Sequence, residues 1–260
     1  MTIRTESTTD GIARIALDAP DRLNPLGDAT LAALHAAFDA IAADSAARVV
    51  ILSATGRAFC AGHDLREMQA KRASADSAAA LKDLFDRCAA LMLRIRSLPQ
   101  PVIAQVQGLA TAAGCQLVAT CDMAVAADDA RFGVNGVNIG LFCSTPMVAL
   151  TRNIGAKAAF EMLTTGRFIS AAEAQALGLV NRVVPAAALA AETSALAQTI
   201  AGKLGAAVRI GKQAFYAQAE MDIAAAYRFA GDVMVANMAR DDTAEGIAAF
   251  LDKRAPDWAR

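Results

Sequence analysis

The chain has 260 residues, a length that suits one large domain or one domain with a helical extension. Its 25 basic and 26 acidic residues give a formal net charge of −1, and no long run of like charge occurs, which argues against a nucleic-acid-binding protein. Hydrophobic residues make up 55% of the chain and aromatic residues only 5%, as is typical of a soluble, helix-rich, tightly packed protein.

Cysteine usage and the first residues bear on the compartment. The five cysteines lack CxxC spacing, and an odd number in a chain of this length favours reduced thiols. The first ten residues, MTIRTESTTD, have no apolar segment typical of a secretory signal, and Glu6 and Asp10 weigh against a transit peptide. We therefore expect a cytoplasmic protein.

Two further classes of site are disfavoured by the sequence. With only His35 and His63 available, a histidine-based metal site is not expected. Residues 101–121 are uncharged but contain three glutamines, so a buried strand followed by a buried helix is expected there instead of a membrane span.

Predicted strands and helices alternate along the first two thirds of the chain. Alternating or β-branched runs predict strands over residues 11–18, 48–56, 101–108, 123–127 and 180–184. Apolar residues at helical spacing predict helices over residues 28–43, 64–72, 81–97, 114–120, 145–153 and 171–177. Ser170 and Glu173 form a capping box for the last of these, and helices alone follow Pro185. This order indicates an α/β core domain over residues 1–200 and a helical region over residues 201–260.

Two of the strand-to-helix turns are made mostly of small residues. Residues 56–65 read GRAFCAGHDL and residues 108–117 read GLATAAGCQL. A helix N-terminus carries unpaired N–H groups and a partial positive charge, and small residues let a ligand approach the backbone. Two such turns facing each other would form an oxyanion hole, whereas either turn alone is an ordinary tight connection.

The pair of turns resembles the two motifs of the crotonase superfamily, also called the enoyl-CoA hydratase/isomerase family. The first family motif is similar to AFxAGxDL, as in residues 58–65, and the second to GxAxGGGxxL, as in residues 108–117. The resemblance continues in order along nearly the whole chain, at Leu23-Asn24-Pro25-Leu26, Cys121-Asp122-Met123, Phe132-Gly133, Thr165-Gly166-Arg167 and Phe250-Leu251-Asp252-Lys253-Arg254.

This resemblance implies a fold, an assembly and a ligand. The fold is an α/β crotonase (ClpP/crotonase-like) spiral of ββα units with an α-helical C-terminal extension. Family members assemble as trimers or dimers of trimers, so residues 201–260 are expected to be a trimerisation region. The apolar residues of this region suit such packing or an intramolecular core: Ile223, Tyr227, Phe229, Val233 and Met234. The implied ligand is an acyl-CoA thioester, with coenzyme A as part of the substrate and no separate cofactor.

The resemblance also assigns site residues. The two oxyanion-hole N–H groups fall on His63 and on Ala113, where the family usually has glycine and where alanine is tolerated only at negative φ. Coenzyme A contacts are implied for Asn24, Leu26, Ala61, His63, Asp64 and Leu65, and, from a neighbouring subunit, for Phe250 and Lys253. Lys253 taken alone is equally typical of a solvated charge at a helix end.

The chain departs from the family where its hydratases carry two glutamates, which act on one water as base and acid. Those positions are Gln116 and Gly136 here. Gln116 cannot take up a proton at neutral pH, and Gly136 has no side chain. Because each positioned proton transfer is worth about a hundred- to ten-thousand-fold, ordinary hydration of enoyl-CoA is expected to be weak or undetectable.

Other side chains near the two motifs remain open in role. His63 either contributes its imidazole or only contacts coenzyme A. Residues 137–140 resemble the Val-Asn-Leu-Gly of decarboxylating members, but Cys143 stands where those members carry a tyrosine. Cys143 itself is either a thiol near the acyl chain or a small buried hydrophobe.

Three functions therefore stay open. The first is an acyl-CoA-processing lyase or isomerase that stabilises a thioester enolate. The second is a decarboxylase of a malonyl-type thioester such as methylmalonyl-CoA, which needs no base. The third is a non-catalytic acyl-CoA-binding protein.

Overall fold

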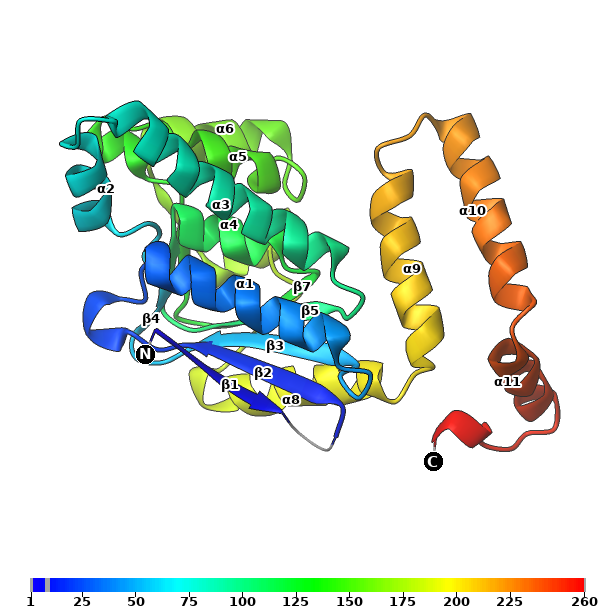
Figure 1. Ribbon diagram of the computed structural model, residues 1–260. Helices are drawn as coiled ribbons and strands as arrows, with labels where there is room; N and C mark the ends of the chain where they lie inside the picture. Colours follow the sequence, from blue (N-terminus) through cyan, green and yellow to red (C-terminus); the bar gives the residue numbers. More distant parts are fainter. Residues whose placement is uncertain (1, 8–9, 260) are drawn as a thin grey trace.

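The computed structural model describes residues 2–7 and 10–259. Met1, residues 8–9 and Arg260 lie outside the described residues, so the predicted terminal segments are described only in part. Eleven α-helices are found in the described ranges, around two β-sheets (Figure 1).

The larger sheet has six strands, in the order β1-β2-β3-β5-β7-β10. Only β1 runs antiparallel to its neighbour β2, and the other pairs are parallel. Its strands are β1 (Ile3–Ser7), β2 (Ile12–Leu17), β3 (Val49–Ala54), β5 (Val102–Val106), β7 (Met123–Ala127) and β10 (Arg182–Val184).

The smaller sheet has four strands, in the order β4-β6-β8-β9, with β9 antiparallel to β8. They are β4 (Ala58–Cys60), β6 (Leu109–Thr111), β8 (Arg131–Gly133) and β9 (Phe168–Ser170). After each of β3, β5 and β7 the chain crosses directly from the larger sheet into the smaller one. This repeated ββ step is the predicted spiral, so the fold class inferred from the resemblance is confirmed.

Helices cover both faces of the larger sheet. Val50 and Leu52 of β3 belong to the main core, whereas Val49 and Ile51 face the opposite side and belong to a second apolar cluster. Residues of α8 complete that second cluster, and α1, α3 and α4 contribute to the main core. The core helices are α1 (Asp28–Ala43), α2 (Leu65–Arg72), α3 (Ser77–Ser97), α4 (Ala113–Thr120), α5 (Ser144–Leu150), α6 (Ala156–Thr165), α7 (Ala171–Leu177) and α8 (Leu189–Ala201).

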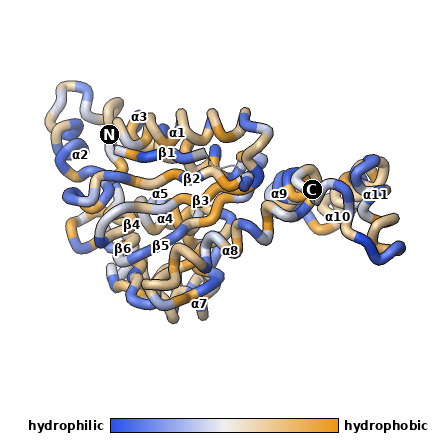
Figure 2. The backbone as a smooth tube through the Cα atoms, turned by 90° about the horizontal axis from the view of Figure 1, so that it is seen from below, coloured by the Kyte–Doolittle hydropathy of each residue, from blue (hydrophilic) through white to orange (hydrophobic). Residues whose placement is uncertain are grey.

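The last three helices form a tail that projects away from the two sheets (Figures 1 and 2). They are α9 (Gly205–Gln218), α10 (Ile223–Met238) and α11 (Asp241–Leu251). Lys212 of α9 is 7% exposed, and its Nζ bonds to Asp122 Oδ2 at 2.6 Å and to the carbonyl oxygens of Ile95 and Gln100, each at 2.9 Å. α10, every residue of which the structure describes, contains no buried residue. One buried ion pair therefore attaches a largely unpacked tail to the core.

The predicted elements differ from the observed ones mainly where strands are short. Strands β1, β4, β6, β8 and β9 and helix α6 were not among the predicted elements. α3 begins at Ser77, four residues before its predicted start at residue 81. The division at residue 200 falls in the last turn of α8 and stays a prediction.

Candidate functional site

The two small-residue turns lie against each other, and glycines make the contact possible. A Cβ placed on Gly62, whose φ is +91°, would lie 3.0 Å from the Thr111 carbonyl oxygen and 3.2 Å from the Ala113 nitrogen. A Cβ placed on Gly114 would lie 2.2 Å from the Cys60 carbonyl oxygen. Real Cβ atoms do not approach this closely, so the backbones meet only because both positions lack side chains.

Each turn leaves one backbone N–H without a protein acceptor. Ala113 is the first residue of α4, where helical N–H groups have no intrahelical partner. Across residues 2–7 and 10–259, neither His63 N–H nor Ala113 N–H donates a hydrogen bond to the protein. Because the Ala113 nitrogen lies beside Gly62, which precedes His63, the two free donors belong to one small region at the positive end of α4.

The strained backbone residue is Ala112 and not Ala113, the alanine that stands where the family usually has glycine. Ala113 is not among the residues with positive φ, so it keeps its donor in a helical conformation. Ala112 instead has φ +50° and ψ −119°, in a region that only glycine adopts readily. The Ala112 N–H donates to the Gly133 carbonyl at 2.9 Å, which ties the strained turn to β8.

The His63 ring has one hydrogen-bonded nitrogen, Nδ1, and one buried nitrogen without a partner in the described chain, Nε2. Its Nδ1 lies 3.1 Å from the Leu26 carbonyl oxygen, and because a carbonyl only accepts, Nδ1 carries the hydrogen. Burial lowers the pKa of His63. Its Nε2, buried and without a partner in the described chain, is therefore a hydrogen-bond acceptor. The ring meets Phe85 of α3 edge-on, with centroids 5.6 Å apart.

The positions of the two missing glutamates differ in how they are filled. Gln116 is 5% exposed, and its Oε1 is buried with no partner among the described residues. A Cβ on Gly136 would lie 2.5 Å from the Leu141 carbonyl oxygen and 2.9 Å from Cys143 Sγ. The Cys143 sulfur accepts from the Gly136 N–H at 3.4 Å, and burial raises the pKa of the Cys143 thiol. The Gly136 position is therefore closed against a side chain, whereas the Gln116 position holds a neutral amide.

Several residues assigned to coenzyme A act within the protein. Asn24 is 1% exposed; its Oδ1 accepts from Ala19 N–H, and its Nδ2 donates to the carbonyls of Thr55 and Ala58, each bond being 2.8 Å. Leu26 is fully buried and donates its N–H to the Gly62 carbonyl at 2.8 Å. These side chains shape the loop that supports the first turn, so any contact of theirs with a ligand is through backbone atoms.

The remaining members of that set differ in exposure, and Asp64 is buried. Asp64 is the N-cap of α2, accepting from Arg66 N–H at 2.9 Å, and it pairs with Arg22 at 3.0 Å. Leu65 is 55% exposed and Ala61 is partly exposed. Each of these two residues stands two positions from His63 in the chain, so they flank its free N–H.

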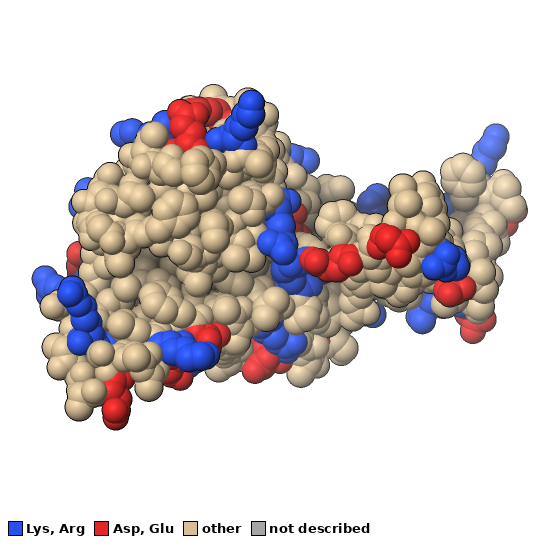
Figure 3. Space-filling model, turned by 90° about the horizontal axis from the view of Figure 1, so that it is seen from above, with Lys and Arg blue, Asp and Glu red and all other residues tan. Residues whose placement is uncertain are grey.

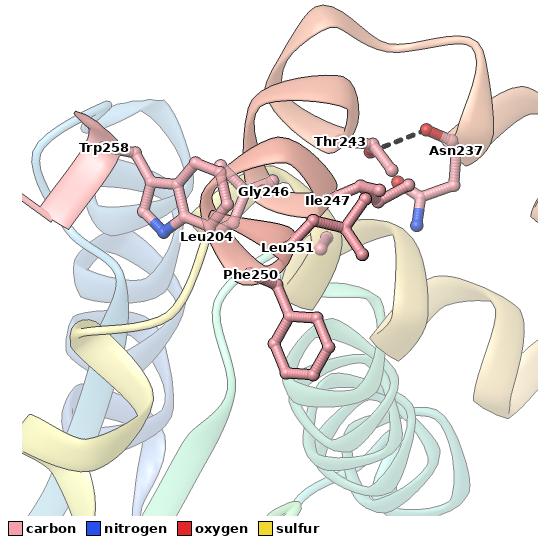
Figure 4. Close-up of a pocket in the computed structure, with 9 residues that line it drawn as sticks. Leu204, Asn237, Thr243, Gly246, Ile247, Phe250, Leu251 and Trp258 are labelled. Carbon is pink, nitrogen blue, oxygen red and sulfur yellow. Dashed lines mark hydrogen bonds between the residues drawn. The ribbon is translucent and has the colours of Figure 1, made fainter. Parts of the chain in front are cut away.

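Phe250 and Lys253 are not brought to the two turns within one chain. α11, which carries Phe250, lies on the side of the molecule opposite α2 (Figures 1 and 2). Phe250 is 82% exposed, and its ring points away from Gly246 and Trp258 (Figure 4). The tail cavity beside it, about 400 Å³, is lined by apolar side chains that include Leu204, Ile247, Leu251 and Trp258.

Sequence reasoning did not identify Phe85 or Ala112. Phe85 is one apolar residue in a regular helical pattern, and its contact with His63 spans 22 positions of sequence that no local pattern connects. Ala112 had a readable signal, since it also occupies a glycine position of the second motif.

The described residues hold no cluster of three or more His, Cys, Asp or Glu side chains placed to bind a metal ion. None of the helices within the described ranges is both long and apolar enough to span a bilayer. On the face seen in Figure 3, Lys and Arg are interspersed with Asp and Glu and do not gather in one patch.

Known proteins resemble this chain over nearly its full length. A model of the enoyl-CoA hydratase/isomerase family matches residues 7–260. The chain is 46% identical over 250 residues to mouse "Enoyl-CoA hydratase domain-containing protein 3, mitochondrial", covering 96% of this chain and 82% of that protein. A Thermus thermophilus protein named "Putative enoyl-CoA hydratase" is 35% identical over 251 residues, covering 94% of this chain and 96% of that one.

Solved structures agree in fold. An enoyl-CoA hydratase of Mycobacterium smegmatis has a TM-score of 0.96 and 52% identity, with 100% of both chains covered. Human enoyl Coenzyme A hydratase domain-containing protein 3 has a TM-score of 0.94 and 44% identity, covering 99% of this chain and 100% of that one.

The predicted cytoplasmic location is wrong in the light of these relatives. The mouse, human and rat proteins, 46%, 46% and 45% identical to this chain, are all named as mitochondrial. Unpaired cysteines indicate only a reducing environment, which does not single out the cytoplasm, and the first residues of the chain proved a poor guide to compartment.

The family match, the relatives and the shared fold agree with the two turns described above: the chain belongs to the enoyl-CoA hydratase/isomerase family.

Proposed function

We propose that this protein binds an acyl-CoA thioester and polarises its carbonyl between the backbone N–H groups of His63 and Ala113. The observation that carries the proposal is the contact between the two turns: Gly62, which precedes His63, lies against the Ala113 nitrogen, and neither the His63 N–H nor the Ala113 N–H has an acceptor in the described chain. A thioester oxygen gains negative charge as an enolate forms, and preorganised amides stabilise that charge. Each such donor is worth about a hundred- to a thousand-fold in rate.

The same geometry disfavours classical hydration. A hydratase of this family needs a base and an acid on one water, and here neither position carries a carboxylate. Gln116 is a neutral amide, and the space that a side chain at 136 would need is taken by the Leu141 carbonyl and Cys143. The proposed activity is therefore enolate stabilisation on a thioester, with weak or no addition of water to enoyl-CoA.

The proposed assembly is a trimer or a dimer of trimers, in which the helical tail of one chain completes the site of a neighbouring chain. Large apolar side chains of the tail are exposed, among them Ile223 (77%), Tyr227 (76%) and Phe250 (82%). Monomers seldom expose so much apolar surface. Phe250 and Lys253, remote from the turns of their own chain, are placed by this proposal against the nucleotide end of coenzyme A on a neighbour.

The proposal is tested by separating the two turns. In Gly114→Ala the new methyl group meets the Cys60 carbonyl at 2.2 Å, so the donors move apart. Calorimetric titration with crotonyl-CoA is expected to show at least a tenfold loss of affinity relative to wild type. Gly211→Ala, in α9 with open space around it, is the matched control and is expected to bind as wild type does. If wild type binds crotonyl-CoA no better than free coenzyme A, the proposal is wrong.

A further inference from the structure

Helix α2, whose residues are all described, follows the first turn directly and contains no buried residue. It begins at Leu65, two positions after His63, and lies at the edge of the core beside the first turns of α3 (Figure 1). Met68 is the apolar residue of α2 that packs against the main core, and it is only partly buried. A helix of two turns is unstable by itself, so other contacts must hold α2 in place.

Charged side chains of α2 supply those contacts, and Asp28 at the start of α1 receives them. Glu67 Oε2 accepts from the Asp28 N–H at 2.8 Å. Gly27 leaves room for this cap, since a Cβ there would lie 2.5 Å from Glu67 Oε1. Lys71 Nζ donates to Asp28 Oδ2 at 2.8 Å, and Arg87 of α3 holds the other oxygen, Oδ1, at 2.6 Å. Polar contacts with one residue of α1 therefore close α2 onto the core.

The first turn is held by a different set of bonds, made with the loop between β2 and α1. The Ala61 N–H donates to the Leu23 carbonyl at 3.0 Å, and the Leu26 N–H donates to the Gly62 carbonyl at 2.8 Å. The His63 ring is bonded to the Leu26 carbonyl at 3.1 Å. The backbone that presents the His63 N–H would therefore keep its place if α2 moved away.

The ion pair that holds α2 is weak enough to open. The Lys71 side chain is 19% exposed and the Asp28 side chain 44% exposed. A pair with this exposure shifts an equilibrium by about two- to fivefold, and salt screens it. Residues 73–76, which join α2 to α3, are exposed and lie outside any helix, so α2 can swing on them without exposing a fully buried side chain.

We infer that α2 is a lid beside the proposed thioester site, held shut by the pairing of Lys71 with Asp28 and by the contact of Glu67 with the start of α1. This inference rests on the proposed function, because the ligand that the lid encloses is the thioester held at His63. The donor of the first turn stays in position while the lid is open. An acyl-CoA therefore enters a preorganised site, and the lid sets how fast it enters and leaves.

The inference is tested by weakening the latch. Lys71→Met keeps most of the side chain and loses its charge. Hydrogen exchange of residues 65–72, followed by mass spectrometry at low salt, should be about two- to fivefold faster than in wild type. Added sodium chloride should speed this exchange in wild type and not in the variant.

The effect on the ligand is measured by stopped-flow absorbance with 2,4-hexadienoyl-CoA, a chromophoric thioester. In Lys71→Met the association and dissociation rate constants should both rise by about two- to fivefold, because the lid opens for entry and for exit. Their ratio, the dissociation constant, should stay as in wild type, since the latch is lost equally from the free and the bound protein.

Two further variants serve as controls. Lys82→Met removes a lysine of α3 that pairs with Asp86 of the same helix, and it should leave the exchange of α2 and both rate constants unchanged. Asp28→Asn removes the other partner of the latch. Adding Lys71→Met to Asp28→Asn should cause no further acceleration, because the pair is already broken.

Each other outcome is decisive. Faster exchange of α2 with unchanged rate constants shows that α2 does not gate the site and overturns the inference. Weaker binding at an unchanged association rate overturns it as well, because α2 would then be a fixed wall that contacts the ligand. Unchanged exchange of α2 in Lys71→Met removes the latch. These three results leave the proposed function intact. If wild type binds 2,4-hexadienoyl-CoA no more tightly than free coenzyme A, the proposed function fails together with the inference.

Discussion

Ala112 shows how one side chain can strain a functional turn. Its φ of +50° and ψ of −119° place an alanine where glycine is strongly preferred, next to the free amide of Ala113. Such backbone strain costs about 1–3 kcal/mol and persists only where the surroundings enforce it. Here the enforcing contacts are the Ala112 N–H bond to Gly133 and the packing of Gly62 against the turn.

Ala112→Gly is therefore expected to stabilise the protein. Relief of strain exceeds the entropy that glycine adds to the unfolded chain, so the free energy of unfolding should rise by about 1 kcal/mol. Ala113→Gly is the matched control: its φ is not positive, and glycine at the start of α4 should lower that free energy by up to about 1 kcal/mol. Urea denaturation of both variants measures the difference, and a loss of stability in Ala112→Gly would contradict the strain argument.

His63 makes stability depend on pH in a predictable direction. Burial holds its folded pKa below the usual 6.5, so the unfolded chain binds a proton more readily than the folded one. The free energy of unfolding should therefore rise with pH between the folded pKa and about 6.5, and this contribution should be lost as the pH falls through that window. His63→Gln cannot titrate. The difference in unfolding free energy between wild type and this variant should shrink on acidification. A difference that stays constant with pH would show that the pKa of His63 is not lowered in the folded protein.

At the scale of elements, the loop between β8 and α5 fills the space that a glutamate at position 136 would need. Gly136 opens a short 3₁₀ turn, Gly136–Ile139, and the loop folds back so that Leu141 N–H donates to the Gly136 carbonyl at 2.9 Å. A side chain at 136 has no room unless this loop moves.

Restoring both glutamates is accordingly expected not to restore hydration. In Gln116→Glu with Gly136→Glu, the second side chain meets the Leu141 carbonyl at 2.5 Å, so the loop must shift and stability should fall by about 1–3 kcal/mol. The spectrophotometric hydration assay with crotonyl-CoA and urea denaturation are the two measurements, with Gln116→Glu alone as the control. A double variant that hydrates crotonyl-CoA at wild-type stability would show that the loop is not the obstacle.

The sequence predicted long elements well and short ones poorly. α1 matches its predicted bounds, residues 28–43, because its apolar spacing is regular over four turns. The Ser170 cap was also predicted, and Ser170 Oγ accepts from the Glu173 N–H at 3.2 Å. Strands β4, β6, β8 and β9 have three residues each, too few for any alternation to be read, and they are paired by contacts distant in sequence.

The sequence predicted those parts of the candidate site that lie within the two motifs. The small residues of both turns indicated close backbone approach, and Gly62 and Gly114 make that approach. What remained inaccessible was three-dimensional: the use of Asn24 inside its loop, the closure of position 136 by Cys143, and the unpaired acceptor of Gln116. Each depends on which atoms meet across the fold, and no spacing in the sequence encodes that.

On the scale of the whole molecule, Lys212 links the tail to Asp122, which follows α4. Asp122, which follows α4 by two residues, accepts from Lys212 and from Val102 N–H at 2.6 Å and from Tyr216 Oη at 2.7 Å. Burial lowers the pKa of Lys212, and the Asp122 carboxylate opposes that shift.

Lys212→Met is expected to destabilise the protein severely. Removing one partner leaves the Asp122 charge buried with fewer donors, at a cost of about 3–5 kcal/mol. Lys157→Met, on the exposed surface of α6, is the control and should change stability by less than about 0.5 kcal/mol. Thermal and urea unfolding measure both. If the Lys212→Met variant is as stable as the control, the ion pair does not hold the tail to the core.

The tail exposes more apolar surface than is usual for an isolated chain. Exposed apolar residues run along α10 and α11, and α10 has no buried residue of its own. A face of this kind suits a contact with a different patch on a neighbouring copy, and such head-to-tail contacts form rings where the rotation closes. Wild type is therefore expected to have a mass in solution about three or six times 26.9 kDa.

Tyr227→Glu puts a charge on that face, and light scattering of this variant should show a shift toward the single chain. Its affinity for crotonyl-CoA, measured by calorimetric titration, should also be weaker, because Phe250 and Lys253 would no longer reach a neighbour. Arg228→Ala, one residue along on the exposed surface, should keep the assembly. A wild-type protein that is monomeric yet binds crotonyl-CoA would show that the site is complete within one chain.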